Sequence, residues 1–338
     1  MTDRTAFAQA KREELPEQQQ YALRKATRWQ IFTIIYTCCT ITVVSFVLGG
    51  SQAMKTAWIE DMLSTLPQVA FLVGLVVIRR KPDPDHPYGW HRAMSIGHLL
   101  ASAALLAVGG LLAFDAISSL FSGERPEIGE VELFGQEVWF GWVMIGVMAV
   151  IVIGPLIYGP AKAKLAPVLH SKLLFADADM AKADWQTNVA SIVGVLGIGA
   201  GIGWLDGAAA LFISAGILWD GVKNSRAAVA DLMDRRARLF NDKEPHELRG
   251  QVVEYLLGLS WVSDAGVRLR DEGQVFHVEA FVVPHERSVV LEQLGEASTG
   301  IAELDWKVQD VVVIPTDPLP FYADRCEEIR NPAGTVAT

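Results

Sequence analysis

Long apolar blocks occupy most of residues 29–225 and limit the folds that the chain can adopt. A helix needs about 20 residues to cross the ~30 Å hydrocarbon core of a bilayer. Six segments reach that length, so the sequence predicts a mostly α-helical integral membrane protein with six transmembrane helices, surrounded by lipid. The predicted spans are Trp29–Gly49, Ala53–Ile78, Met94–Leu120, Val138–Tyr158, Leu173–Ile202 and Trp204–Val222.

Basic residues in the connections predict the orientation. They are concentrated in the N-terminal arm and in the second-to-third and fourth-to-fifth connections, whereas the third-to-fourth connection, "SGERPEIGEVELFGQEV", has one Arg among five Glu. Cytoplasmic loops are enriched in Lys and Arg, so we expect both termini in the cytoplasm. The polar start "MTDRTAFAQAKREELPEQQQ" does not resemble a signal peptide, and we expect a plasma (inner) membrane protein.

The part of the chain after the apolar blocks has the composition of a soluble domain. Residues 244–257 and 287–303 have helical patterns, whereas "DAGVRLRD", "QVFHVEAFVV" and "VQDVVVIP" resemble strands. This order predicts a small α+β, ferredoxin-like cytoplasmic domain with its helices on one face of the sheet. The expected organisation is an arm (1–27), a membrane domain (28–230), the α+β domain (231–318) and a tail (319–338).

Charge and cysteine content exclude two classes of protein. The net charge is −10, and no Lys/Arg stripe offsets it, which argues against nucleic-acid binding. The three cysteines, Cys38, Cys39 and Cys326, do not form a disulfide framework, because adjacent cysteines are poor partners for each other.

Acidic residues interrupt two of the predicted spans. An ionised carboxylate inside a bilayer costs several kcal/mol unless it is paired, hydrated or bound to a cation, so such residues are functional candidates. The acids in question are Glu60 and Asp61 in the second span and Asp177, Asp179 and Asp184 in the fifth.

A purely structural explanation is also open for these acids. Glu60 and Asp61 would then cap the helix or pair with Lys55. Asp177 and Asp179 would pair with Lys182 in the same way.

The positions of Glu60 and Asp184 favour a shared site. Glu60 lies about 14 Å along its helix from Ser51, and Asp184 lies about 20 Å from Ser171. Because the two spans enter the membrane from opposite sides, both carboxylates approach its middle.

One further side chain on each helix shares a face with these carboxylates. Residues four apart lie on one face of a helix, so Ser64 accompanies Glu60 and Met180 accompanies Asp184. Met180 taken alone would be ordinary packing, since thioether side chains are common fillers of cores.

A second polar cluster lies in the connection "KPDPDHPYGWHRAMSIGH". Carboxylates and imidazoles bind Zn²⁺ and its neighbours in the first transition row, and the cluster contains Asp83, Asp85, His86 and His91. The alternative is a solvated loop in which Asp83 and His86 cap the next helix.

The same stretch resembles the loop and third span of the cation diffusion facilitator family, whose members typically read P-x-D-x-x-H-P-Y-G-H-G-R-A-E. "WLDGAAALFISAGILWDGVKNSRAAVADLMD" is similar to the sixth span of that family, and "VFHVEAFVVP" with "VQDVVVIPTDP" resembles its cytoplasmic dimerisation domain. The resemblance implies a homodimeric six-span exporter of divalent transition metals, usually driven by proton antiport. The metal ion would be its substrate and protons its counter-ions.

The resemblance also implies a transport site shared by spans two and five. The matching residues are Glu60, Ser64, Met180 and Asp184, where Ser64 replaces a carboxylate and Met180 an imidazole. Two or three carboxylates with hydroxyl or thioether favour a harder or more adaptable ion such as Mn²⁺, Fe²⁺ or Co²⁺, and Zn²⁺ stays open as a substrate. Residues that could complete the site are Asp61, Asp177, Asp179 and Gln68.

Other family positions match less well. In the loop, the resemblance implies metal binding by Asp83 and His86, while the second family histidine falls on Trp90, next to His91. In the cytoplasmic domain Glu279 and Asp317 fall near family metal positions. The family histidines are absent there, so we expect no metal in this domain.

His277 of the cytoplasmic domain is expected at the surface.

The sequence leaves two other functions open. A dimeric membrane scaffold or regulator, inactive in transport, would explain Ser64 and Met180. A metal-dependent hydrolase would use the loop cluster, but the sequence has no nucleophile elbow, His-Glu-x-x-His or phosphate loop. We therefore expect a transporter and no enzyme.

Overall fold

A computed structural model describes residues 15–122, 126–133, 136–273, 275–286 and 288–325. The chain divides into two compact units. Residues 21–229 form the first, a helical bundle, and the chain from 230 onward forms most of the second. The beginning of the predicted arm (1–14) and the end of the predicted tail (326–338) lie outside the described residues.

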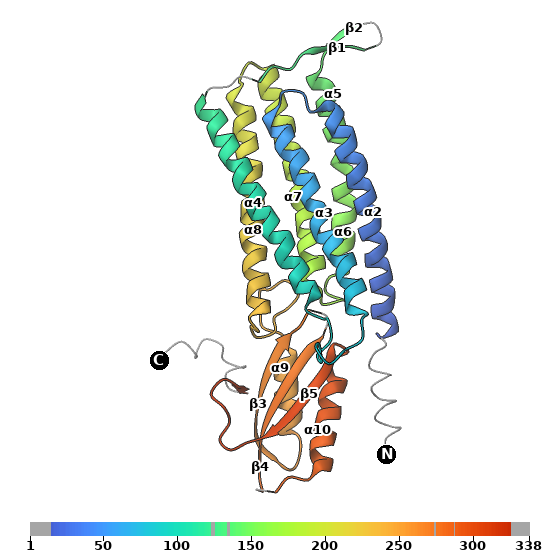
Figure 1. Cartoon of the computed structure of the whole chain (residues 1–338), viewed down its shortest axis with the longest axis vertical. Helices are drawn as coiled ribbons and strands as arrows, with labels where there is room; N and C mark the ends of the chain where they lie inside the picture. The colour runs from blue at the N-terminus through green and yellow to red at the C-terminus, as the bar shows by residue number, and fades with distance from the viewer. Residues whose placement is uncertain (1–14, 123–125, 134–135, 274, 287, 326–338) are drawn as a thin grey trace. The chain divides into compact units, whose positions relative to one another are not determined.

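The first unit is a bundle of long helices that lie side by side (Figure 1). Of the described helices, α2, α3, α4, α8 and the pair α5–α6 are long and apolar enough to span a membrane, so five of the predicted segments are confirmed as apolar helices of sufficient length. The helices are α2 (Glu17–Val47), α3 (Gln52–Ile78), α4 (Ala93–Ser122), α5 (Gly141–Ile151), α6 (Ile153–Ala163), α7 (Lys172–Gly199) and α8 (Trp204–Leu232).

The fifth predicted span forms α7, a helix of 28 residues that packs against α3, α4, α5 and α6. Its acidic and basic residues keep it outside the set of five apolar helices. This composition suits a helix that other helices surround, because its polar side chains can then contact protein and not lipid.

A proline explains why the fourth predicted span is two helices, α5 and α6. Pro155 has no N–H to donate to the carbonyl of Ile151, four residues earlier. The hydroxyl of Tyr36 donates to that carbonyl at 2.9 Å, which matters because an unbonded carbonyl is costly in lipid. A Cβ at Gly154 would lie 2.4 Å from the Tyr36 ring, so only glycine leaves room for this contact.

The connection before α5 contains a hairpin that the sequence pattern does not predict. Strands β1 (Glu130–Leu133) and β2 (Gln136–Trp139) pair in antiparallel fashion. Each strand has four residues, which is too short for an alternating pattern to be recognised. The predicted start of the fourth span, Val138, therefore lies in β2, and the helix begins at Gly141.

The second unit has the predicted order helix–strand–strand–helix–strand and one further strand. The sheet order is β5-β4-β3-β6, in which β4 and β5 are parallel and the other neighbours antiparallel. Helices α9 and α10 pack against each other and against the sheet. The elements are α9 (Leu248–Leu257), β3 (Val262–Asp271), β4 (Phe276–Pro284), α10 (Leu291–Leu304), β5 (Val308–Pro315) and β6 (Asp324–Arg325).

Strand β6 lies in the segment predicted as a tail, and a buried carboxylate holds it there. Asp324 is 2% exposed and lies 2.6 Å from a guanidinium nitrogen of Arg249 and 2.8 Å from one of Arg236. The sheet therefore extends past residue 318.

Candidate metal site between α3 and α7

Helices α3 and α7 run in opposite directions and pack against each other. Each begins with a serine whose hydroxyl accepts a hydrogen bond from a backbone N–H: Ser51 from Met54 and Ser171 from Leu174. Ser191, late in α7, donates to the carbonyl of Ala53, early in α3, at 3.4 Å. Residues in the middle of the two helices therefore face each other.

Glu60 of α3 and Asp184 of α7 lie in this middle region, and each is 6% exposed. The Glu60 carboxylate hydrogen-bonds with Thr187 of α7 and interacts electrostatically with Asp184. Within the described chain no Lys, Arg or His nitrogen lies within 4.0 Å of either carboxylate. Oε2 of Glu60 is buried and has no hydrogen-bond partner among the described residues. The Lys162 ammonium interacts with Asp184 only from beyond that distance. A pair of buried carboxylates without a protein cation in direct contact is the arrangement that a metal ion would neutralise.

Ser64 and Met180 are also buried, on the same two helices. The Ser64 hydroxyl donates to the carbonyl of Asp61 at 2.9 Å, which leaves the lone pairs of its oxygen for another partner. Gln68 is 3% exposed, and its Oε1 has no hydrogen-bond partner in the described chain. Ser64 and Met180, four residues from Glu60 and Asp184 on their helices, offer uncharged oxygen and sulfur atoms as possible ligands, whereas Gln68 lies about two turns from Glu60.

Three residues near the carboxylates were not predicted. Tyr158 of α6 donates to Oδ2 of Asp184 at 3.3 Å, and Thr187 contacts Glu60. Asn188 donates from Nδ2 to the carbonyl of Asp184 at 2.7 Å. The spacing of Thr187 and Asn188, three and four residues after Asp184, would have identified them. Nothing in the sequence near Tyr158 indicates its contact with α7.

Asp177, a candidate ligand, is neutralised by a different lysine from the one predicted. Its Oδ2 lies 2.7 Å from the ammonium of Lys162 and accepts from Nε2 of Gln30 at 2.8 Å. The pairing with Lys182 was therefore wrong for Asp177. For Asp179 it was partly right, because Lys182 lies 3.9 Å away while Lys223 lies at 2.7 Å.

The predicted pairing of Glu60 and Asp61 with Lys55 was wrong. Lys55 lies 3.9 Å from Asp115 of α4, and both side chains are exposed. Asp61 is half-buried. In the described part of the chain, Glu60, Asp61 and Asp184 do not bring three ligand atoms within 4.8 Å of one another.

The loop cluster forms a turn on the surface. Oδ1 of Asp83 accepts from the backbone N–H groups of Asp85 and His86 at 3.0 and 2.7 Å, and lies 2.9 Å from Nδ1 of His86. The hydrogen bond from the His86 side chain lowers the pKa of Asp83 below its usual value. Burial lowers the pKa of His91. Asp83 therefore caps this turn, whereas the alternative prediction had it cap the following helix.

His277 was predicted at the surface, and this was wrong. It is 6% exposed, and its Nδ1 lies 2.7 Å from Oδ2 of Asp310 on β5. Glu279 is bound to Arg268 on the neighbouring strand, and Asp317 is exposed.

The sequence model of the cation efflux transmembrane domain matches residues 29–233, which contain every helix of the site. The chain belongs to the cation diffusion facilitator family. Its five apolar helices and this membership make it an integral membrane protein.

Curated relatives of this cation diffusion facilitator include three transporters. The manganese efflux system protein MneS of Bacillus subtilis is 26% identical over 72% of this chain and 78% of its own length. The cation-efflux pump FieF of Shewanella oneidensis is 24% identical over 69% of this chain and 78% of its own. The mouse proton-coupled zinc antiporter SLC30A2 is 28% identical over a shorter region, 28% of this chain and 27% of its own.

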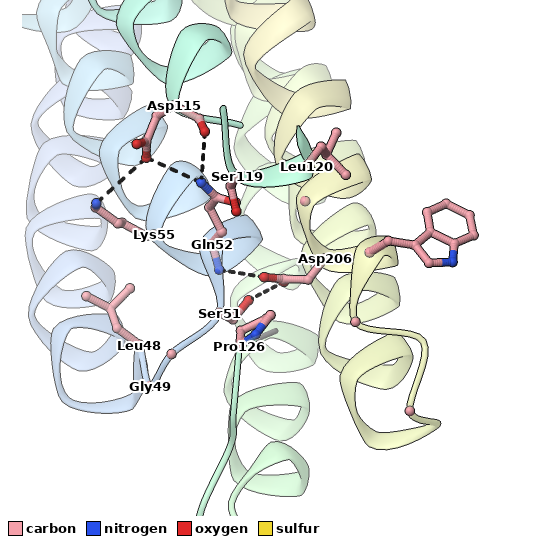
Figure 2. Close-up of a pocket in the computed structure, with 15 residues that line it drawn as sticks. Leu48, Gly49, Ser51, Gln52, Lys55, Asp115, Ser119, Leu120, Pro126 and Asp206 are labelled. Carbon is pink, nitrogen blue, oxygen red and sulfur yellow. Dashed lines mark hydrogen bonds and ion pairs between the residues drawn. The ribbon is translucent and has the colours of Figure 1, made fainter. Parts of the chain in front are cut away.

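A pocket of about 800 Å³ lies where α3 and α8 of this facilitator begin (Figure 2). Asp206 of α8, which is 0% exposed, points at the start of α3. Its carboxylate accepts from the Ser51 hydroxyl and the Gln52 N–H at 2.6 Å each, and from the Ala53 N–H at 3.3 Å. Helix α3, which carries Glu60, is thus fixed to α8 through its otherwise unpaired N–H groups.

Proposed function

We propose that this protein exports a divalent transition metal ion through a site formed by Glu60 and Asp184, with Ser64 and Met180 beside them. The observation that carries the proposal is the pair of buried carboxylates on facing helices, neither of which has a protein cation within 4.0 Å in the described chain. The other two acids of α7 differ from Asp184 in this respect, since Asp177 and Asp179 each have a lysine partner.

The donor atoms favour Mn²⁺, with Fe²⁺ and Co²⁺ as further substrates and Zn²⁺ less favoured. Carboxylate, hydroxyl and amide oxygens suit Mn²⁺, and the Met180 thioether is the single soft ligand of the proposed set. Imidazole and thiolate, which Zn²⁺ prefers, are absent from α3 and α7. The name of the relative MneS, a manganese efflux protein, supports the same choice.

Proton antiport follows from the chemistry of the site. A dication and protons compete for the same carboxylate oxygens, so the ion displaces protons when it binds from the cytoplasm. Protons return on the other side, and the ion leaves. The proton-coupled relative SLC30A2 supports this coupling.

The proposed topology has six spans, with α7 as the fifth along the chain and α8 as the sixth, and both termini in the cytoplasm of a plasma-membrane homodimer. The pocket around Asp206 then lies at the outer end of the bundle. Asp83 and His86 are assigned an accessory role at most, because Oδ1 of Asp83 and Nδ1 of His86 already contact each other in an exposed turn.

Metal flux into proteoliposomes tests the proposal. Wild-type protein is expected to transport Mn²⁺ faster than Zn²⁺, and Glu60→Gln or Asp184→Asn to reduce Mn²⁺ flux to that of protein-free vesicles. Asp115→Asn, which removes an exposed carboxylate of the same bundle, is the matched control and should transport normally. Wild-type flux in Glu60→Gln and Asp184→Asn would overturn the site. Absence of flux for every divalent metal in the wild type would instead favour the inactive scaffold.

A further inference from the structure

Tyr158 connects α6 to the proposed metal site. The side chain is 4% exposed, and its hydroxyl donates to Oδ2 of Asp184 at 3.3 Å. A hydroxyl that bonds one carboxylate oxygen restricts the rotation of the whole carboxylate. The orientation of Asp184 therefore depends on α6 as well as on α7.

A buried ion pair one turn away holds the same face of α6 against α7. Lys162, four residues after Tyr158, is 0% exposed and lies 2.7 Å from Oδ2 of Asp177. Its ammonium also lies 5.0 Å from the centre of the Tyr158 ring. Because Gln30 of α2 donates to the same Asp177 oxygen, the pair is fixed from a third helix.

The two helices approach closely between these contacts. A Cβ at Gly159 would lie 3.1 Å from the Cβ of Ala181, so glycine allows α6 to come within hydrogen-bonding reach of α7. Tyr158 and Lys162 lie on one face of α6, and Asp177 and Asp184, seven residues apart, lie on one face of α7. Two contacts therefore join α6 to α7: the ion pair between Lys162 and Asp177 and the hydrogen bond from Tyr158 to Asp184.

We propose that Tyr158 is a positioning residue of the metal site, which holds Asp184 of α7 in place for an ion shared with Glu60 of α3. The inference rests on the proposed function, since it assigns a third helix to the same site. A carboxylate held in place before the ion arrives loses less conformational freedom on binding, so the hydroxyl increases the affinity for the ion.

The test is Tyr158→Phe, which removes the hydroxyl and keeps the ring beside Lys162. We expect the KM for Mn²⁺ in proteoliposomes to rise about tenfold, the factor that corresponds to one lost hydrogen bond to a charged group, with the maximal rate per transporter unchanged. Equilibrium binding of Mn²⁺ to the purified full-length protein should weaken by a similar factor. Tyr36→Phe is the matched control, because its hydroxyl bonds a backbone carbonyl, and should leave the KM unchanged.

The outcomes separate this inference from the proposed function. A wild-type KM and wild-type binding in Tyr158→Phe, or a lower maximal rate with an unchanged KM, would overturn the positioning role. Asp184→Asn, measured in the same preparation, tests the site itself. If Asp184→Asn is inactive while Tyr158→Phe behaves as wild type, only the positioning role fails; if Asp184→Asn is fully active, the proposed function fails.

Discussion

The ammonium of Lys162 lies 2.7 Å from the carboxylate of Asp177, and both side chains are buried inside the helical bundle. The lysine accounts for the burial of one acid of α7, Asp177, without any metal ion. Asp184, two turns further along the same helix, has no such partner within 4.0 Å in the described chain, and the contrast between these two aspartates defines the candidate site.

Removing one member of this pair should destabilise the protein strongly. Asp177→Asn leaves the Lys162 ammonium buried without a counter-charge, which costs about 3–5 kcal/mol. The double variant Lys162→Met/Asp177→Leu should recover most of this stability, because apolar side chains tolerate burial. Unfolding of the purified protein in detergent measures both effects. Equal stability of Asp177→Asn and wild type would show that the ion pair has no structural role.

Asp206 should stabilise the start of α3. Asp206→Ala removes the acceptor for three donors and is expected to cost about 1–2 kcal/mol, while Asp206→Asn, which keeps one carbonyl oxygen, should cost less. The exposed pair Lys55–Asp115 at the same pocket provides the control, since Asp115→Asn should change stability by at most about 1 kcal/mol. If Asp206→Ala, Asp206→Asn and Asp115→Asn all have the free energy of unfolding of the wild type, Asp206 does not anchor α3.

The last strand of the C-terminal domain should depend on Asp324. Asp324→Asn weakens the contacts with Arg249 and Arg236 and should lower the stability of the sheet edge by roughly 2 kcal/mol. Faster amide hydrogen exchange in β3, the neighbouring strand, is the readout in the full-length protein. Asp317→Asn, at an exposed position, should leave that exchange unchanged. Unaltered exchange in Asp324→Asn would contradict the assigned role of β6.

His86→Ala should change the loop and leave transport nearly intact. Loss of the His86 hydrogen bond should raise the pKa of Asp83 toward the ordinary value of about 3.9, as NMR titration of a labelled carboxyl would show. Because the pKa of Asp83 is lowered in the folded chain, its contribution to the turn is present above that ordinary value and is lost as the pH falls through the lowered pKa. We expect the KM for Mn²⁺ to change by no more than about twofold. A much larger loss of affinity would instead make the loop a metal site.

The sequence predicted the helices well because apolar length is a local property. Five apolar helices follow directly from it, and the order of the C-terminal elements follows from helical and strand-like patterns, which are also local. The break between α5 and α6 was not predicted, although Pro155 is visible in the sequence. The residue that satisfies the freed carbonyl of Ile151 is Tyr36, which comes from a distant part of the chain and could not be identified from the sequence.

The candidate site was harder to predict, because the partner of a buried charge can lie anywhere in the sequence. Asp177 was matched with the nearby Lys182, but its partner Lys162 lies on another helix. His277 was placed at the surface because its pairing with Asp310 depends on the register of β4 and β5. Composition indicates which residues are unusual, and the fold decides which of them are neutralised.

The most direct test of the metal site is anomalous X-ray scattering from crystals of the protein grown with Mn²⁺. We predict a manganese peak between α3 and α7, within coordination distance of carboxylate oxygens of both Glu60 and Asp184. A map that lacks a peak there, with each carboxylate bonded to a lysine or facing bulk solvent, would contradict a metal site shared by Glu60 and Asp184.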